Sequence, residues 1–240
     1  LRKSRLHPRS INRRLTTCAL FHEFLFGSNT SQTSKTRWSR LPSGGVLGLN
    51  RPRWRRSRRR SRLKVKVPMR GVEPLTPQEV ASFTRDILRY RDLAIVALML
   101  LGGLRSAEIL NLRLSDLHCV ERTLRVLGKG NKERVVPLHP DAWDALNRYL
   151  RHERPAPSRT DRVFVALQGS VRGQPMKPAG LRNLFRYRRL SSGVSRANAH
   201  RFRHTFGTDL AKTGMGLPVL QRLLGHADPL TTLQYIHYSQ

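Results

Sequence analysis

Acidic residues are scarce in this sequence. Only 15 Asp and Glu accompany 46 Lys and Arg in 240 residues, which gives a formal net charge of +31. A chain this basic repels itself unless it binds a polyanion, so the first prediction is a nucleic-acid partner. The alternative is a disordered basic tail on a neutral enzyme. Residues 71–240, however, hold 26 basic and 14 acidic residues and still carry +12, which favours the nucleic-acid partner.

Cysteine and long apolar runs are also scarce. Cys18 and Cys119 lie far apart in unlike contexts, which predicts a reducing compartment and no disulfide framework. The longest apolar run, residues 93–104, has 12 residues. It is too short to span a bilayer and is typical of a core helix. No secretory signal is visible. The expected location is therefore the cytoplasm, without membrane association.

Two different segments are predicted before residue 72. Apolar residues recur at roughly helical spacing in residues 9–26, so residues 1–26 are predicted to include a helical segment. Residues 27–71 are predicted to be a basic, largely disordered linker. Ser, Thr and Gly dominate its first half, and residues 51–66 contain ten Lys or Arg in 16 positions. Such a run would order on phosphates; the alternative is a solvated linker with nonspecific affinity.

Residues 72–240 are predicted to form a mainly α domain with a small antiparallel β-sheet (α+β). Thr76, Pro77 and Glu79 have the form of a capping box, which predicts a helix to about Tyr90. A β-hairpin with a polar turn and a further short strand are also expected. These two features lie in residues 123–138 and 163–167. Further helices are predicted in residues 93–101, 106–112, 141–152, 180–190, 200–214, 217–226 and 229–238.

The segment HRFRH, residues 200–204, is the first candidate site. His200 and Arg203 are three positions apart and share a helix face. His200 and His204 have the spacing of a zinc-binding helix. However, Arg201 replaces the glutamate of HExxH, and the arginines would repel a cation. An imidazole beside a guanidinium suits a phosphate better, and the alternative for His200 is a purely structural role.

Two more segments contain candidate cations. In GGLRSAEIL, Arg105 follows a glycine turn and precedes a helix, where backbone N–H groups favour an anion. Glu108 lies three positions on, and the alternative is an ordinary Arg–Glu surface pair. In GKGNKER, Lys129 and Lys132 lie at the hairpin tip without P-loop spacing. A lysine there is suited to entering a DNA groove or donating a proton; the alternative is that lysines are simply common in turns.

In their order, these segments resemble the tyrosine recombinase (phage-integrase-like) catalytic domain over about residues 72–240. The resemblance rests on GLRSAEILNLRLSDL, RVLGKGNKERVVPL, HRFRHTFGTDLAKTG and LLGHADPLTTLQY. Upstream, RSINRRLTTCALFHEFL also looks like the end of the family's helical core-binding domain, most of which would precede Leu1. The family's six-residue signature falls on Arg105, Lys129, His200, Arg203, His226 and Tyr235.

The resemblance implies an enzyme that breaks and rejoins DNA strands with no cofactor, neither metal nor ATP. The guanidiniums of Arg105 and Arg203 suit the nonbridging oxygens of a phosphodiester and the charge that develops on them. His226 would be a third donor. Glu108 matches the family's acidic position in the first motif and is given an orienting role toward Arg105 or its neighbours.

The remaining roles concern proton transfer and attack. Tyr235 is the nucleophile that would form a 3′-phosphotyrosine, and His200 is the candidate base for its phenol proton. Lys129 is the candidate acid for the leaving 5′ oxygen. It is preferred to Lys132 because it directly follows the first hairpin strand, as the family's lysine does.

The resemblance further implies double-stranded DNA as partner, a homo- or hetero-tetramer on that DNA, and a bacterial or phage-encoded, nucleoid-associated protein. The main prediction is therefore a site-specific recombinase or integrase. One alternative is a type IB topoisomerase, which uses similar catalytic groups. The other is a catalytically impaired or truncated DNA-binding remnant of a mobile-element integrase. The chain begins with Leu rather than Met, which is expected of a fragment.

Overall fold

The computed structural model describes residues 10–11, 13–17, 73–128, 132–158, 160–225, 231–232 and 235. The chain divides into two compact units, Leu1–Arg70 and Gly71–Gln240. In the first unit, the described residues 10–11 and 13–17 are helical, as expected for part of the predicted segment 1–26. The predicted linker, residues 27–71, lies outside the described residues. The predicted domain boundaries therefore stay predictions.

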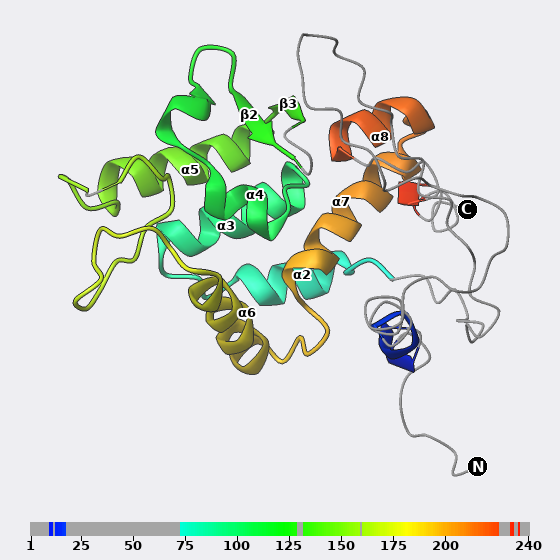
Figure 1. The fold of residues 1–240 in the computed structure, drawn as a ribbon, viewed down its shortest axis with the longest axis horizontal. Helices are drawn as coiled ribbons and strands as arrows, with labels where there is room; N and C mark the ends of the chain where they lie inside the picture. Colours follow the sequence, from blue (N-terminus) through cyan, green and yellow to red (C-terminus); the bar gives the residue numbers. More distant parts are fainter. Residues whose placement is uncertain are drawn as a thin grey trace, which may run out of the picture. The chain divides into compact units, whose positions relative to one another are not determined.

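The second unit is mainly helical with one small sheet (Figure 1). Its prediction as a mainly α fold with a small antiparallel β-sheet is confirmed. The helices are α2 (Pro77–Thr84), α3 (Tyr90–Leu101), α4 (Ser106–Asn111), α5 (Pro140–His152), α6 (Pro178–Ser192), α7 (Ala199–Lys212) and α8 (Leu217–Leu224), with a 3₁₀ turn, η1, at Leu114–Asp116. Among the helices of the described ranges, none combines the length and the apolar character that a bilayer span requires.

Helix α2 begins as predicted and ends earlier than predicted. Thr76 and Glu79 form the capping box: each side chain accepts a hydrogen bond from the other residue's backbone N–H. The predicted continuation to Tyr90 is wrong, because α2 ends at Thr84 and α3 begins at Tyr90. The buried guanidinium of Arg188, on α6, donates to the carbonyls of Phe83 and Asp86. These contacts satisfy carbonyls at the end of α2 that a longer helix would have used itself.

The core is built around α3, which packs against both α5 and α7 (Figure 1). The apolar run predicted to be a core helix lies here, and five of its side chains in α3 are fully buried: Ala94, Ile95, Val96, Leu98 and Met99. Aromatic rings join α2, α6 and α7 to this core. The ring of Phe83 lies 4.9 Å from that of Phe202 and 5.7 Å from that of Phe185, centroid to centroid. This packing anchors α7, the helix that carries the HRFRH segment.

The sheet has three antiparallel strands in the order β1 (Leu117–His118), β2 (Thr123–Leu127) and β3 (Glu133–Pro137). The predicted hairpin is confirmed as β2 and β3, whereas β1 was not predicted. The strand predicted at residues 163–167 is wrong as a sheet strand. Val165 forms only an isolated bridge with Pro175, because this segment is buried against α5, where Tyr149 donates to the Val163 carbonyl and accepts from the Val165 N–H.

A tight turn joins α3 to α4. Gly103 has φ +63, and a Cβ there would lie 2.4 Å from the ring of Phe206 on α7. Only glycine combines that backbone conformation with so close an approach. The turn therefore places the start of α4, and with it Arg105, directly beside α7.

Candidate active site

Arg105 is held in place at the start of α4. Its backbone N–H donates to Glu108 Oε2 at 2.8 Å, and its Nη1 donates to Glu108 Oε1 at 2.8 Å. Its Nη2 donates to the carbonyl of Gly225 at 3.1 Å, so it also contacts the end of α8. The Arg105 side chain keeps 36% of its surface exposed, whereas that of Glu108 keeps 4%. The pair is therefore not the ordinary surface pair that was the alternative prediction.

Glu108 is the centre of a cluster of three guanidiniums. Arg134, on β3, donates from Nη1 to Oε1 and from Nη2 to Oε2, both at 2.9 Å. Arg203, on α7, has its Nη1 3.8 Å from Glu108 Oε2. The side chains of Arg134 and Arg203 are 9% and 3% exposed. One carboxylate among three cations leaves the cluster with an excess of two positive charges, an arrangement suited to binding an anion.

The pKa values of Glu108 and Arg203 are consistent with ionisation of both groups near neutral pH. Burial raises the pKa of Glu108, but hydrogen bonds and charge from Arg134 and Arg105 outweigh it and lower the pKa to about 2. Burial, followed by the charge of Arg105, lowers the pKa of Arg203 to about 10. Arg203 also donates to the backbone carbonyls of Gly103 and Leu224. It therefore stays a cation whose planar group is held by α7, the α3–α4 turn and the end of α8.

The depressed pKa of Glu108 makes the protein's stability depend on pH. The carboxylate stabilises the fold fully above its ordinary pKa of 4.5, and this contribution is lost as the pH falls toward about 2. We expect a loss of roughly 2 kcal/mol by pH 3 from this group alone. Urea unfolding between pH 6 and pH 3 measures it, with Glu108→Gln as the comparison for the other carboxylates. Parallel pH dependences of the two proteins would contradict the assignment.

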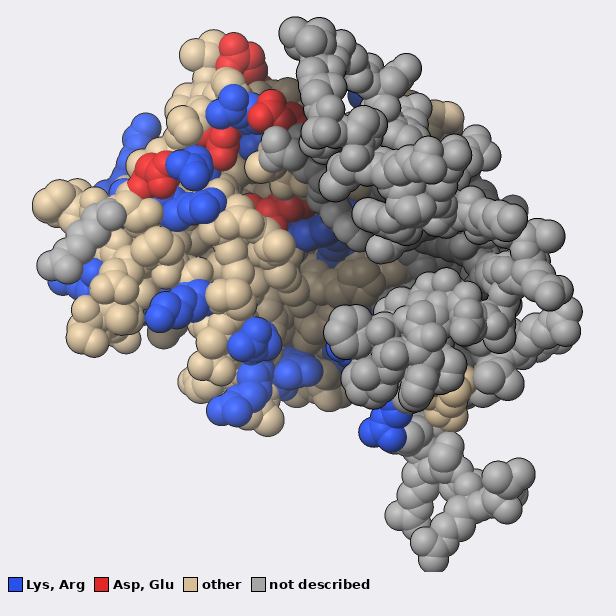
Figure 2. Space-filling model, viewed as in Figure 1, with Lys and Arg blue, Asp and Glu red and all other residues tan. Residues whose placement is uncertain are grey.

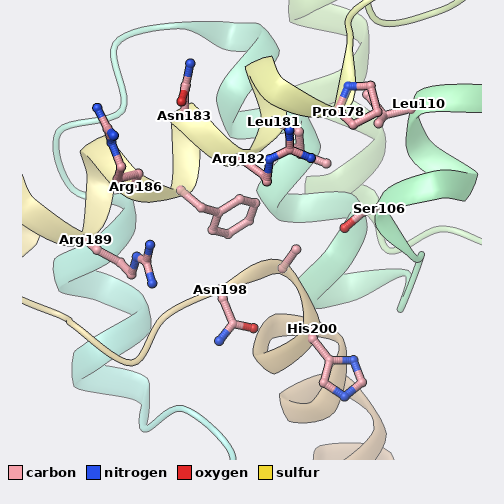
Figure 3. Close-up of a pocket in the computed structure, with 12 residues that line it drawn as sticks. Ser106, Leu110, Pro178, Leu181, Arg182, Asn183, Arg186, Arg189, Asn198 and His200 are labelled. Carbon is pink, nitrogen blue, oxygen red and sulfur yellow. The ribbon is translucent and has the colours of Figure 1, made fainter. Parts of the chain in front are cut away.

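His200 lies in the first turn of α7 and lines a cavity of about 600 Å³ between α4, α6 and α7. Figure 3 shows Ser106 on α4, Arg182 and Arg186 on α6, and His200 around this cavity. Desolvation, followed by the charges of Arg203, Arg105 and Arg201, lowers the pKa of His200. The imidazole is therefore predominantly neutral near pH 7 and able to accept a proton.

The side of this cavity formed by α6 is part of a basic surface. Arg182, Arg186 and Arg189 lie on α6, a helix that contains no Asp or Glu. In Figure 2, blue Lys and Arg side chains gather over the position of α6, whereas the red acidic side chains in this view lie elsewhere. The structure thus places a basic surface next to His200.

Tyr235 is buried against α7, with 1% of its surface exposed. Its ring lies 4.7 Å from that of His204, centroid to centroid. A Cβ on Gly207 would lie only 2.7 Å from Tyr235 Cε1, so the ring packs directly on the backbone of α7. The charge of Tyr235 also acts on the pKa of Arg203, which places the two side chains in one neighbourhood.

Five of the predicted site residues thus come together around α7: Arg105, Glu108, His200, Arg203 and Tyr235. Lys129 and His226 lie outside the described residues. Next to them in the sequence, Gly128 N donates to the Lys132 carbonyl at 2.8 Å, and the Gly225 carbonyl accepts from Arg105. In the described part of the chain, no group of three His, Cys, Asp or Glu could hold a metal ion.

Sequence reasoning missed Arg134. Besides its double hydrogen bond to Glu108, Arg134 donates from Nε to the carbonyl of Leu223 at 3.0 Å. It therefore joins the hairpin to both α4 and the end of α8. A signal was available, since alternation along β3 puts Arg134 on the same face as the buried Val136. An inward-facing cation requires a buried anion, and Glu108 was the candidate in the first motif.

The fold is that of tyrosine recombinase catalytic domains. The crystal structure of XerA recombinase superposes with a TM-score of 0.63 at 27% sequence identity, over 73% of this chain and 65% of that one. A complex of the XerH site-specific recombinase with its difH substrate has a TM-score of 0.60 at 24% identity, which supports the fold alone. The model of the phage integrase family matches residues 74–240. The chain belongs to the phage integrase family.

Individual relatives agree with this assignment. Tyrosine recombinase XerD of Lacticaseibacillus casei is 41% identical over 160 residues, 65% of this chain and 53% of the relative. Tyrosine recombinase XerD of Halalkalibacterium halodurans is 30% identical over 237 residues, 96% of this chain and 71% of the relative. The chain spans about half the length of the first of these relatives and about seven tenths of the second.

Proposed function

We propose that the protein is a site-specific DNA recombinase or integrase that cleaves and rejoins DNA strands through a 3′-phosphotyrosine intermediate. The observation that carries the proposal is the cluster around Glu108, where three guanidiniums share one carboxylate. Its excess positive charge suits a phosphodiester, whose nonbridging oxygens gain charge in the transition state. The recombinases among its relatives support this function over a topoisomerase or an inactive remnant.

In the proposed reaction, Arg105 and Arg203 bind the nonbridging oxygens of the scissile phosphate. Arg203 is almost fully buried and held by two backbone carbonyls, so its guanidinium is oriented before DNA arrives and must become accessible to the phosphate when DNA binds. Arg105 is the more exposed of the two and offers the first contact. Glu108 orients both, and Arg134 neutralises and fixes Glu108.

Tyr235 attacks the phosphorus through its phenolic oxygen. The neutral His200 accepts the phenol proton, and Lys129 donates a proton to the leaving 5′ oxygen. His226 adds a donor to the phosphate. Since the 3′-phosphotyrosine retains the energy of the broken ester bond, rejoining needs neither ATP nor a metal. Tyr235 is buried in this structure, so its phenolic oxygen must become accessible when DNA binds, while its ring stays packed on Gly207.

The partner proposed for this surface is duplex DNA, bound by a homo- or hetero-tetramer in the cytoplasm at the nucleoid. The basic cavity wall formed by Arg182, Arg186 and Arg189 supports contact with the phosphate backbone beside the active site.

A trapping experiment tests the function. A duplex is first selected from a random library by binding to the protein, and a nick is then placed close to the bound centre. Cleavage beside the nick releases a short strand, which prevents rejoining and traps the protein on DNA. We expect a covalent adduct, stable in denaturing gels, that forms in EDTA and without nucleotide. An adduct that requires a divalent metal, or no adduct on tightly bound duplexes, would contradict the proposal.

A further inference from the structure

His204 is a buried histidine that the proposed reaction does not yet use. It lies on α7 one turn after His200 and has 1% of its surface exposed. Neither Nδ1 nor Nε2 has a hydrogen-bond partner within the described structure. Leaving both nitrogens of a buried imidazole without partners costs folding free energy, whereas an apolar ring of similar size would fill the same space without that cost. Within the described residues, the polarity of His204 therefore has no structural explanation.

The position of His204 suggests what its polarity is for. Its ring contacts the ring of Tyr235 at a centroid distance of 4.7 Å and an interplanar angle of 46°. The ring of His200 lies 5.0 Å from that of His204, centroid to centroid, in an edge-to-face arrangement. His204 is thus in ring contact with both the proposed nucleophile and the residue proposed to accept its proton.

The protonation state of His204 suits a hydrogen bond. Burial, followed by the charges of His200, Arg201 and Arg203, lowers the pKa of His204 to about 4. The imidazole is therefore neutral at physiological pH, with one N–H donor and one nitrogen lone pair. A neutral ring can either donate to a phenolate or accept from a phenol, and it adds no further charge to a site already rich in cations.

We propose that His204 is a positioning residue for the nucleophile, whose imidazole forms a hydrogen bond with the phenolic oxygen of Tyr235 when DNA is bound. This inference rests on the proposed role of Tyr235. The hydrogen bond fixes the direction of the phenol oxygen toward the phosphorus, while Arg105 and Arg203 fix the phosphate. It also explains why a polar ring occupies a position where an apolar ring would pack at least as well.

The test replaces His204 with Phe, which keeps an aromatic ring but removes both nitrogens. We expect His204→Phe to have an unchanged or higher Tm and an unchanged Kd for the selected duplex. We expect its rate of adduct formation at saturating DNA to fall by about tenfold or more. His204→Gln, which restores a donor and an acceptor, should cleave several-fold faster than His204→Phe. If the larger Phe ring lowers the Tm, His204→Leu takes its place in the same comparison.

A matched control is available on the same helix. Thr208 lies one turn further along α7, is fully buried, and its Oγ1 also lacks a hydrogen-bond partner in the described structure. Thr208→Val removes that hydroxyl at nearly constant volume and should leave the cleavage rate unchanged. Three results would each overturn the inference. They are cleavage by His204→Phe at the wild-type rate, a loss of DNA affinity in His204→Phe as large as its loss of cleavage rate, and equal cleavage rates for His204→Phe and His204→Gln. If Tyr235→Phe still formed the adduct, the proposed function would fail instead.

Discussion

Replacing Glu108 with glutamine is expected to lower the free energy of unfolding by roughly 3–5 kcal/mol, because it removes the one anion of a buried cluster. Arg134 and Arg203 would remain almost fully buried without a counter-charge. Neither side chain can turn toward solvent easily, because Arg134 donates to the Leu223 carbonyl and Arg203 donates to those of Gly103 and Leu224. The side chain stays nearly the same size, so the loss reports charge rather than a cavity.

Chemical denaturation at neutral pH measures this effect, and Asp144→Asn is the control. Asp144 pairs with Arg148 one turn along α5, but both side chains are more than half exposed. Such a pair contributes at most about 0.5 kcal/mol. A loss below about 1 kcal/mol in Glu108→Gln would mean that the three guanidiniums do not depend on the carboxylate, and the description of the cluster would be wrong.

Replacing Gly207 with alanine is expected to reduce covalent adduct formation by about 100-fold or more while preserving the fold. Gly207 lies inside α7, where alanine ordinarily stabilises a helix by about 0.5–1 kcal/mol. The added Cβ, however, would lie 2.7–2.9 Å from three carbon atoms of the Tyr235 ring. The ring must move, and a displacement approaching 1 Å at a reacting group costs on the order of 100-fold in rate.

The control for Gly207→Ala is Gly180→Ala on α6, whose new Cβ would make only ordinary contact, 3.4 Å or more, with Met176. Both variants are measured for Tm, for DNA affinity and for the rate of adduct formation at saturating DNA. Gly180→Ala should match the wild-type protein in DNA affinity and in the rate of adduct formation, with an equal or slightly higher Tm. A wild-type cleavage rate in Gly207→Ala would show that the packing of Tyr235 on α7 is irrelevant to its reactivity.

Much of the candidate site could be anticipated from the order of short motifs. The spacing of Arg105 and Glu108, and of His200 and Arg203, follows from helical periodicity, which is local and visible in sequence. Their meeting across α4 and α7 depends on the close approach at Gly103, which the sequence shows only as a glycine pair. The meeting of these residues was therefore predicted from the resemblance to a family and not from the spacing of the motifs.

The failed predictions have a common cause in contacts between distant residues. At the end of α2, the Phe83 carbonyl accepts from Arg188, more than 100 positions later, instead of from a further turn of the helix. Strand β1 has only two residues and is defined by its pairing with β2, so its own sequence contains no alternation that predicts a strand. Strand alternation places Arg134 on the inward face of β3, but its partners, Glu108 and the Leu223 carbonyl, lie far away in the sequence. Capping by remote side chains and buried ion pairs leave little trace in local sequence.

The central claim is that Tyr235 becomes covalently joined to the 3′ side of a cleaved DNA strand. The most direct measurement labels either end of the nicked duplex strand, traps the adduct, digests the protein and identifies the peptide that carries the nucleotide. We predict that the nucleotide is attached at Tyr235 through a 3′-phosphate, that the other product carries a free 5′-hydroxyl, and that Tyr235→Phe forms no adduct. Attachment at another residue, linkage to a 5′ end, or an adduct that persists in Tyr235→Phe would contradict the account.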